Sequence, residues 1–176
     1  IASGRGVQAV SEEFNELKLC RSGLMLFNKN DWPIGECLRK YGEFSWLETE
    51  LFRQLVRPDG MSIDVGANIG THTVELARMS PFVVAFEPQR LIFQTLCANL
   101  ALNSIDNVKA FEVALGAVTK KFTVPTRDPR HRNNFGGVLM TENNGGEEGQ
   151  MVAMDEFKFS RVGFIKVDIE GMEADF

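Results

Sequence analysis

Residues 64–70, DVGANIG, combine an acidic side chain with two glycines and an asparagine directly after a short apolar run. Gly66 and Gly70 lack a Cβ, so the backbone can turn tightly and a ligand can lie directly on it. The spacing is GxxxG rather than GxGxxG, because Asn68 stands where a dinucleotide-binding loop has the glycine that makes room for a pyrophosphate. Asp64 repels phosphates and favours a cationic ligand. The stretch therefore predicts a cofactor loop that is unlike a pyrophosphate site.

A second acidic residue, Glu87, follows the next apolar run in VAFEP. A carboxylate at the end of the second strand of a βαβ unit accepts hydrogen bonds from a ribose diol. A glycine loop combined with such a carboxylate fits S-adenosylmethionine, which carries an adenosine and a positive sulfonium but no pyrophosphate. Taken singly, the GxxxG turn is also typical of ordinary turns, and Glu87 of a charged strand end. The cofactor interpretation therefore depends on the two occurring together.

The elements that must position these residues alternate along the chain. Apolar runs predict four strands, at residues 61–65, 82–86, 108–116 and 163–171. Helical periodicity predicts helices over 71–79 and 90–103. This alternation predicts an α/β domain, a parallel sheet flanked by crossover helices, with ligands bound beyond the carboxyl ends of its strands. Two further segments follow the third strand, a short strand at KFTVP and a long surface loop over residues 126–149.

Residues 1–57 are expected to form a lead-in, a hairpin plus a helix, before a cofactor-binding domain at residues 58–176. The hairpin is predicted to pair the strand in GLMLFNKND with the following segment, WPIGECLRKYGEF. The helix is predicted in SWLETELFRQLV, with Ser45 as its N-cap. Pro58, Asp59 and Gly60 supply the turn residues that separate this helix from the next strand.

Composition narrows the class of protein. The net charge of −5 argues against a nucleic-acid binder, which usually presents a basic face. The apolar runs are too short to span a bilayer, and no signal peptide pattern is present. The cysteines Cys20, Cys37 and Cys97 form no CxxC pair. We therefore expect a reduced, cytoplasmic protein with no nucleic-acid partner, no membrane partner and no metal site.

Four stretches together resemble the successive motifs of FkbM-type methyltransferases: SIDVGANIGTHTVELAR, VVAFEPQRLIFQTLCANLALN, FGGVL and FIKVDIEGME. The resemblance extends over roughly residues 20–176. It implies the Rossmann-like class I methyltransferase fold and S-adenosylmethionine as cofactor. The sheet of that fold has more strands than this chain supplies before Phe176, so the domain is expected to be truncated after its fourth core strand.

The resemblance also implies roles for individual residues. The methionine end of the cofactor is expected to lie on Asp64, Gly66, Asn68 and Gly70. Glu87 is expected to hold the ribose, and Ala114 and Leu115 to border the adenine. Asp168 and Glu170 are expected beside the transfer site as catalytic residues, with Asp168 as the first candidate for a general base. For Glu170, compensation of charge at a helix N-terminus is an alternative role.

The acceptor side is less constrained by the sequence. His131, Asn134 and Phe135 are expected to shape an acceptor pocket, although a flexible surface loop accounts for the same segment equally well. His72, in the first turn of its helix, is expected to have a capping or packing role. The expected reaction is O-methylation of a hydroxyl on a small molecule or glycan, either a sugar or a natural product. The oligomeric state is not predicted.

Two other functions remain open at this point. A nicotinamide-dependent oxidoreductase could use the same βαβ unit, but GxxxG counts against it. So does the lack of a Tyr-x-x-x-Lys pattern after the motif, because Tyr41 is the one tyrosine and precedes it. A non-catalytic module that binds an adenosyl ligand is the second alternative.

Overall fold

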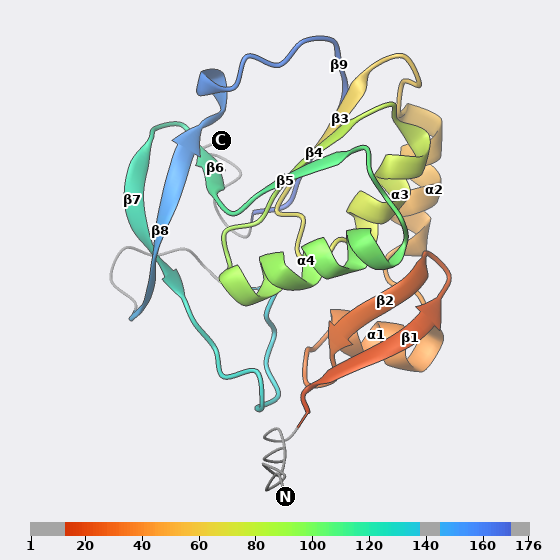
Figure 1. Cartoon of the computed structure of the whole chain (residues 1–176), viewed down its shortest axis with the longest axis vertical. Helices are drawn as coiled ribbons and strands as arrows, with labels where there is room; N and C mark the ends of the chain where they lie inside the picture. The colour runs from red at the N-terminus through yellow and green to blue at the C-terminus, as the bar shows by residue number, and fades with distance from the viewer. Residues whose placement is uncertain (1–12, 138–144, 170–176) are drawn as a thin grey trace, which may run out of the picture.

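The computed structural model describes residues 13–137 and 145–169 of the 176-residue chain. Its central sheet is parallel throughout, with the strand order β5-β4-β3-β9 (Figure 1). The strands are β3 (Met61–Val65), β4 (Val83–Phe86), β5 (Val108–Phe111) and β9 (Val162–Val167). The chain runs outward from β3 to β5 and then returns to β9 on the other side of β3. The order therefore reverses between β3 and β9, the place where open α/β sheets bind ligands.

Both faces of this sheet are covered, which explains why its strands are apolar without alternation. Helices α3 (Thr71–Met79) and α4 (Arg90–Leu102) lie on one face, where Ala85 packs in a common core with Val74 and Leu96. On the other face, the Phe86 ring meets the edge of Phe157 at a centroid distance of 5.0 Å. The prediction of an α/β fold with a parallel sheet and flanking helices is confirmed.

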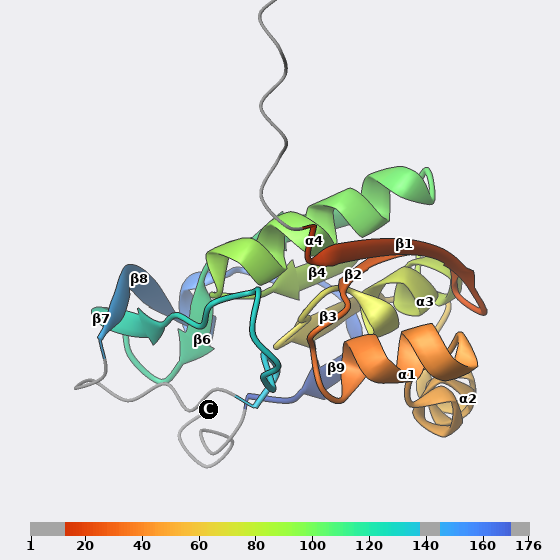
Figure 2. The same ribbon diagram turned by 90° about the horizontal axis from the view of Figure 1, so that it is seen from below.

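The lead-in packs against α4 rather than forming a separate body (Figures 1 and 2). It consists of β1 (Asn15–Cys20), β2 (Gly23–Asn28), α1 (Ile34–Tyr41) and α2 (Trp46–Leu55). Asn99, fully buried on α4, accepts the backbone N–H of Leu26 at 2.6 Å and donates to its carbonyl at 3.0 Å. Asn103 makes the same pair of bonds to Leu24 at 3.0 and 2.8 Å. The two amides therefore hydrogen-bond the backbone groups at the free edge of β2, as a neighbouring strand would.

Three predictions about elements are wrong. The partner of β2 is β1, and WPIGECLRKYGEF instead contains helix α1, whose buried Ile34 and Leu38 lie one helical turn apart. The strand predicted over 108–116 is two strands, because the chain leaves the central sheet after Phe111 and pairs elsewhere as β6. The loop predicted over 126–149 ends at Gly146, where β8 begins.

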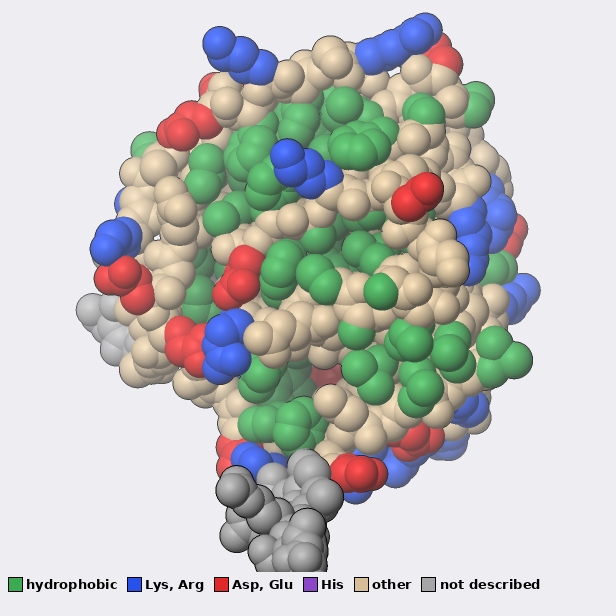
Figure 3. Space-filling view, viewed as in Figure 1, with side chains coloured by type: hydrophobic (Ala, Val, Ile, Leu, Met, Phe, Trp, Pro, Cys, Tyr) green, Lys and Arg blue, Asp and Glu red, His purple; other side chains and the backbone are tan. Residues whose placement is uncertain are grey.

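A second, smaller sheet has the order β6-β8-β7. Its strands are β6 (Ala114–Gly116), β7 (Lys120–Pro125), which confirms the short strand at KFTVP, and β8 (Gly146–Ala153). The short 3₁₀ helix η1 (Met154–Glu156) follows β8. Phe157 and Phe159 then pack against the face of the central sheet opposite helices α3 and α4. Apolar side chains gather on this face between the central sheet and the segment that joins β8 to β9 (Figure 3). Within the described ranges, no helix is long and apolar enough to cross a membrane.

Candidate active site

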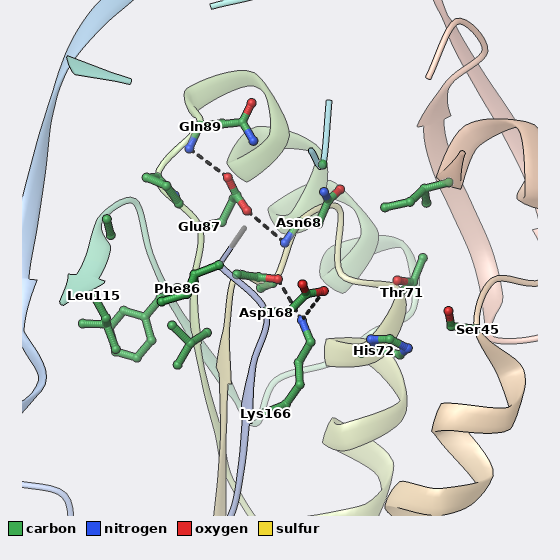
Figure 4. A pocket seen from close by; sticks show the side chains of 18 of the residues that line it. Ser45, Asn68, Thr71, His72, Phe86, Glu87, Gln89, Leu115, Lys166 and Asp168 are labelled. Carbon is green, nitrogen blue, oxygen red and sulfur yellow. Dashed lines mark hydrogen bonds and ion pairs between the residues drawn. The ribbon is translucent and has the colours of Figure 1, made fainter. Parts of the chain in front are cut away.

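A cavity of about 210 Å³ lies beyond the carboxyl ends of β3, β4 and β9, at the reversal of strand order. One end is bounded by the last residue of β4 and by residues that follow β4 and β5, which are Phe86, Glu87, Pro88, Val113, Ala114 and Leu115. The middle is formed by Gly66, Ala67, Asn68, Lys166 and Asp168. The other end is bounded by Pro33, Ile34, Phe44, Ser45, Glu48, Thr71 and His72. Figure 4 shows Phe86 and Leu115 at the first end, Lys166 and Asp168 in the middle, and Ser45, Thr71 and His72 at the other end.

The turn after β3 is tight because Gly66 has φ +75°, a conformation that favours glycine. The N–H groups of Gly66 and Ala67 both donate to the Phe86 carbonyl, at 3.0 and 2.9 Å. A Cβ on Gly66 would lie 1.9 Å from the carbonyl oxygen of Asp168. The glycine therefore allows the ends of β3 and β9 to come together beneath the cavity. Gly70, with φ +88°, is the N-cap of helix α3 and faces Leu96 rather than the cavity.

Glu87 is held in place by backbone donors on both of its oxygens. Oε2 accepts the N–H of Asn68 at 3.0 Å, and Oε1 accepts the N–H of Gln89 at 2.9 Å (Figure 4). The residue is only 3% exposed, and this burial raises the pKa of its carboxyl to about 7 even though both N–H bonds favour the charged form. Each oxygen accepts one bond and can accept another. Glu87 can therefore receive both hydroxyls of a ribose.

The charged centre of the cavity is Lys166, which the sequence reasoning missed. Its Nζ lies 3.0 Å from Asp64 Oδ1 and 3.7 Å from Asp168 Oδ2, and donates to the Gly66 carbonyl at 2.8 Å. Burial alone would lower the pKa of Lys166, but the two carboxylates outweigh it and the pKa is raised. The signal in the sequence was a single charged residue inside the apolar run FIKV. Lys166 joins the ends of β3 and β9 at the glycine turn.

Asp64 lies behind the glycine turn and is not among the residues that line the cavity. It is fully buried, and its Oδ2 accepts the hydroxyl of Thr73 at 2.7 Å while its charge faces Lys166. Its negative charge is therefore balanced within the chain. Asp168 does line the cavity, and its side chain is 64% exposed.

The loop that contains Asn134 is attached to the lead-in. Buried Asp31 accepts the N–H of Phe135 and the N–H of Gly35, each at 3.2 Å. Burial raises the pKa of Asp31, while these two bonds lower it by a smaller amount. The Phe135 carbonyl in turn accepts the side-chain amide of Gln89 at 2.9 Å. Asn134 is thereby placed at the cavity, while the Phe135 side chain is buried in the core behind it.

The remaining site predictions fall in different places. Ala114 and Leu115 line the cavity, although they belong to β6 and not to the end of β5. His131 does not line it: its side chain is 77% exposed and lies 3.2 Å from Asp128. Glu170 lies outside the described residues.

The parallel sheet, the glycine turn at its switch point and the buried Glu87 define a Rossmann-like methyltransferase fold with a candidate nucleoside site. The chain belongs to the FkbM methyltransferase family, since the family model described as "Methyltransferase FkbM domain" matches residues 64–176. This confirms the family predicted from the four motifs. None of the curated proteins compared with the chain matches it.

Several solved structures are similar to part of the chain. An rRNA methylase from Streptococcus thermophilus is 19% identical with a TM-score of 0.37, covering 39% of this chain and 41% of that one. TYW2 from M. jannaschii in complex with AdoMet is 20% identical with a TM-score of 0.44, covering 58% of this chain and 44% of that one. TYW2 from P. horikoshii in complex with MeSAdo is 19% identical with a TM-score of 0.45, covering 60% and 38%. The chain thus spans less than half the length of each.

Proposed function

We propose that this chain is the cofactor-binding part of an S-adenosylmethionine-dependent methyltransferase that methylates a hydroxyl oxygen of a sugar or a natural product. The observation that carries the proposal is the carboxylate of Glu87. It is buried, held by two backbone N–H bonds, and placed beside the glycine turn at the carboxyl ends of β3 and β4. That arrangement suits a ribose diol next to a ligand with no pyrophosphate. The family membership supports the same reaction class.

The residues that would hold the cofactor divide by chemistry. Glu87 would accept the ribose hydroxyls, and the apolar side chains of Phe86 and Leu115 would border the adenine. The glycine turn, Gly66 to Asn68, would lie under the methionine part, with Asp64 and Gly70 supporting the turn from behind. When bound, S-adenosylmethionine supplies a methyl group on a positive sulfur. The sulfur is a good leaving group because it departs as a neutral thioether when the methyl carbon is attacked.

The chain's own contribution to catalysis would be positioning and proton removal. A hydroxyl oxygen is a better nucleophile when a base takes its proton during attack. Asp168 is our candidate for that base, because its carboxylate reaches the cavity and is 64% exposed. The Lys166 ammonium, 3.7 Å from Asp168 Oδ2, directs the Asp168 side chain toward the middle of the cavity. Holding the two reactants in line and away from water supplies much of the acceleration.

The two alternative functions fit the site less well. A nicotinamide dinucleotide needs room for a pyrophosphate against the turn, and Asn68 with its side chain occupies the position of the missing glycine. A phosphate would also meet the carboxylates of Glu87 and Asp168. A non-catalytic adenosyl-binding module would have the same cofactor residues, so only turnover separates it from an enzyme.

The proposal is tested by incubating the protein with S-adenosylmethionine carrying a labelled methyl group and a panel of sugars and hydroxylated natural products. We expect label on an oxygen of at least one acceptor, and about 100-fold slower transfer by Asp168→Asn. Asp106→Asn, an exposed aspartate in the turn before β5, is the matched control and should transfer at the normal rate. Label on nitrogen, or equal rates for the two variants, would contradict the proposed reaction or the proposed base.

A further inference from the structure

The cavity extends well past the proposed cofactor residues to an end formed largely by the lead-in. The lead-in lines this end of the cavity with Phe44, Ser45 and Glu48. These residues precede the segment matched by the family model. Helix α3 contributes Thr71 and His72 from its first turn. Figure 4 shows Ser45, Thr71 and His72 on the side of the cavity opposite Phe86 and Leu115. The glycine turn would therefore lie between a ligand at this end and the proposed position of the adenine.

His72 presents a buried nitrogen that has no hydrogen bond. The residue is 5% exposed, and its Nε2 lacks a hydrogen-bond partner among the described residues. The ring is held by the edge of Phe52, with a centroid distance of 5.1 Å, and lies 6.3 Å from the Phe44 ring. Buried polar atoms are nearly always hydrogen-bonded, because an unpaired one costs about 1–3 kcal/mol. Together with Glu48 Oε2, which lies 3.3 Å away, the nitrogen therefore forms a polar pair at this end of the cavity that a ligand's polar group could complete.

Burial keeps the ring of His72 neutral, even though three nearby carboxylates raise its pKa. Burial lowers the pKa of His72, and Lys166 on β9 lowers it further, against the opposing effects of Asp64 on β3, Glu48 on α2 and Asp168 on β9. Glu48 Oε2 lies 3.3 Å from Nε2, and its side chain is 58% exposed. A neutral imidazole beside a carboxylate offers hydrogen-bond acceptors on two sides. Hydroxyl groups are the natural donors for such a pair.

The net charge of the lining disfavours an anionic occupant. Three carboxylates line the cavity, on Glu48, Glu87 and Asp168, against Lys166 as the one Lys or Arg among the lining residues. The Lys166 ammonium is already engaged by Asp64 and by the Gly66 carbonyl. Bringing a phosphate or carboxylate next to these groups would add a repulsive charge with no free cation to balance it.

We propose that the end of the cavity between helices α2 and α3 is the acceptor subsite, where Glu48 and His72 bind an uncharged hydroxyl compound. This rests on the proposed methyltransferase function and names residues that bind its acceptor. Glu48 accepts one hydroxyl and His72 Nε2 a second, while Phe44 covers the apolar side of the molecule. The lead-in is thereby part of the specificity of the enzyme, and acceptors that carry phosphate or carboxylate groups are rejected.

The experiment uses trans-1,2-cyclohexanediol as the probe and the whole chain saturated with S-adenosylhomocysteine. Nuclear magnetic resonance follows the ring signals of His72, with His131 as the exposed internal reference. We expect saturable shifts at His72 and not at His131. Glu48→Gln should weaken diol binding about tenfold, because a neutral amide replaces the charged acceptor of one hydrogen bond, while Glu43→Gln should not. Glu43 lies in the same segment, outside the cavity, and pairs with Arg21.

Two further ligands separate this proposal from its competitors. The anionic trans-2-hydroxycyclohexanecarboxylate should bind at least about fivefold more weakly than the diol. S-adenosylhomocysteine and 5′-methylthioadenosine, which lacks the amino-acid tail, should bind Glu48→Gln as tightly as the unchanged protein, within about twofold. A selective loss of S-adenosylhomocysteine affinity would assign this end to the cofactor tail and overturn the proposal.

The remaining outcomes are also decisive. A protein that binds S-adenosylhomocysteine but shows no diol-dependent shift at His72 would overturn the acceptor subsite and leave the proposed function standing. A folded protein that binds neither cofactor analogue would refute the proposed function itself, and the subsite with it. A diol that binds Glu48→Gln and the unchanged protein equally well would remove Glu48 from the subsite.

Discussion

The substitution Glu87→Gln tests the part of the site on which the cofactor assignment depends. Both carboxylate oxygens of Glu87 accept backbone N–H groups, from Asn68 at 3.0 Å and from Gln89 at 2.9 Å. Glutamine has nearly the same shape, but one of its two ends is an NH₂ group that cannot accept either bond. It also has no charge with which to bind the ribose hydroxyls. The variant therefore changes the chemistry of the site with little change in its volume.

The expected loss of affinity follows from the number of bonds involved. A hydrogen bond to a charged group contributes about 1.5–3 kcal/mol, and a ribose diol would make two such bonds to Glu87. Their replacement by weaker bonds to an amide should cost about 3 kcal/mol, or roughly 100-fold in the dissociation constant of S-adenosylhomocysteine.

The pH dependence gives an independent signature of the same carboxylate. Burial raises the pKa of Glu87 to about 7, and only the ionised form accepts both hydroxyls. The affinity of the unchanged protein should therefore rise about tenfold per pH unit below pH 7 and level off above it. For folding the sign is the opposite. Because the folded state holds this proton more tightly than the unfolded state, Glu87 lowers the free energy of unfolding as pH rises from about 4.5 to about 7.

Isothermal titration calorimetry between about pH 5.5 and about pH 8.5 measures both effects, with Glu112→Gln, an exposed glutamate directly after β5, as the matched control. The unchanged protein and the control should show the rise with pH, while Glu87→Gln should bind weakly and equally at every pH. An affinity for Glu87→Gln within twofold of the unchanged protein would refute the ribose assignment. A pH-independent affinity of the unchanged protein would refute the role of the charged form.

Three further substitutions test how the site is built, each read out as the free energy of unfolding from denaturant titration. Gly66→Ala should destabilise by about 3 kcal/mol or more, because its Cβ would lie 1.9 Å from the carbonyl oxygen of Asp168 at a positive φ; an unchanged midpoint would contradict this. Lys166→Met should cost about 3–5 kcal/mol by leaving the Asp64 carboxylate buried without its cation, and restoring stability with Asp64→Asn in the same chain is the control. Asn99→Leu should cost about 3 kcal/mol by leaving backbone groups of β2 unsatisfied, and a loss below about 0.5 kcal/mol would show that the lead-in is held otherwise.

The local sequence determined three strands of the central sheet and the glycine turn after β3, and these were predicted. Strands β3, β4 and β9 are apolar runs with turn residues after them, so the position of Glu87 at a strand end followed directly. The glycine turn was recognisable because the backbone requirement at Gly66 is local. The hairpin partner of β2 was not recognisable, because β1 has only the weak alternation of NELKLC. The hydrogen bonds that hold β2 come from Asn99, far along the chain.

The parts of the site that were missed depend on tertiary contacts. Nothing in the local sequence distinguishes Lys166 from other lysines. Its role in the site depends on its ion pairs with Asp64 and Asp168, which the fold places beside it. Glu48 and His72 lie on different helices and meet only because α2 packs against α3. His131 was predicted in the acceptor pocket from its loop alone, and the attachment of that loop through Asp31 leaves the His131 side chain exposed. Periodicity and spacing carry no information on such contacts.

The most direct test of the proposed function is a calorimetric titration of the folded protein with S-adenosylhomocysteine and, separately, with NADH. We predict micromolar or tighter binding of S-adenosylhomocysteine and no measurable binding of NADH, because Asn68 replaces the glycine that makes room for a pyrophosphate and carboxylates line the cavity. Binding of NADH in preference to S-adenosylhomocysteine would contradict the methyltransferase assignment of the site.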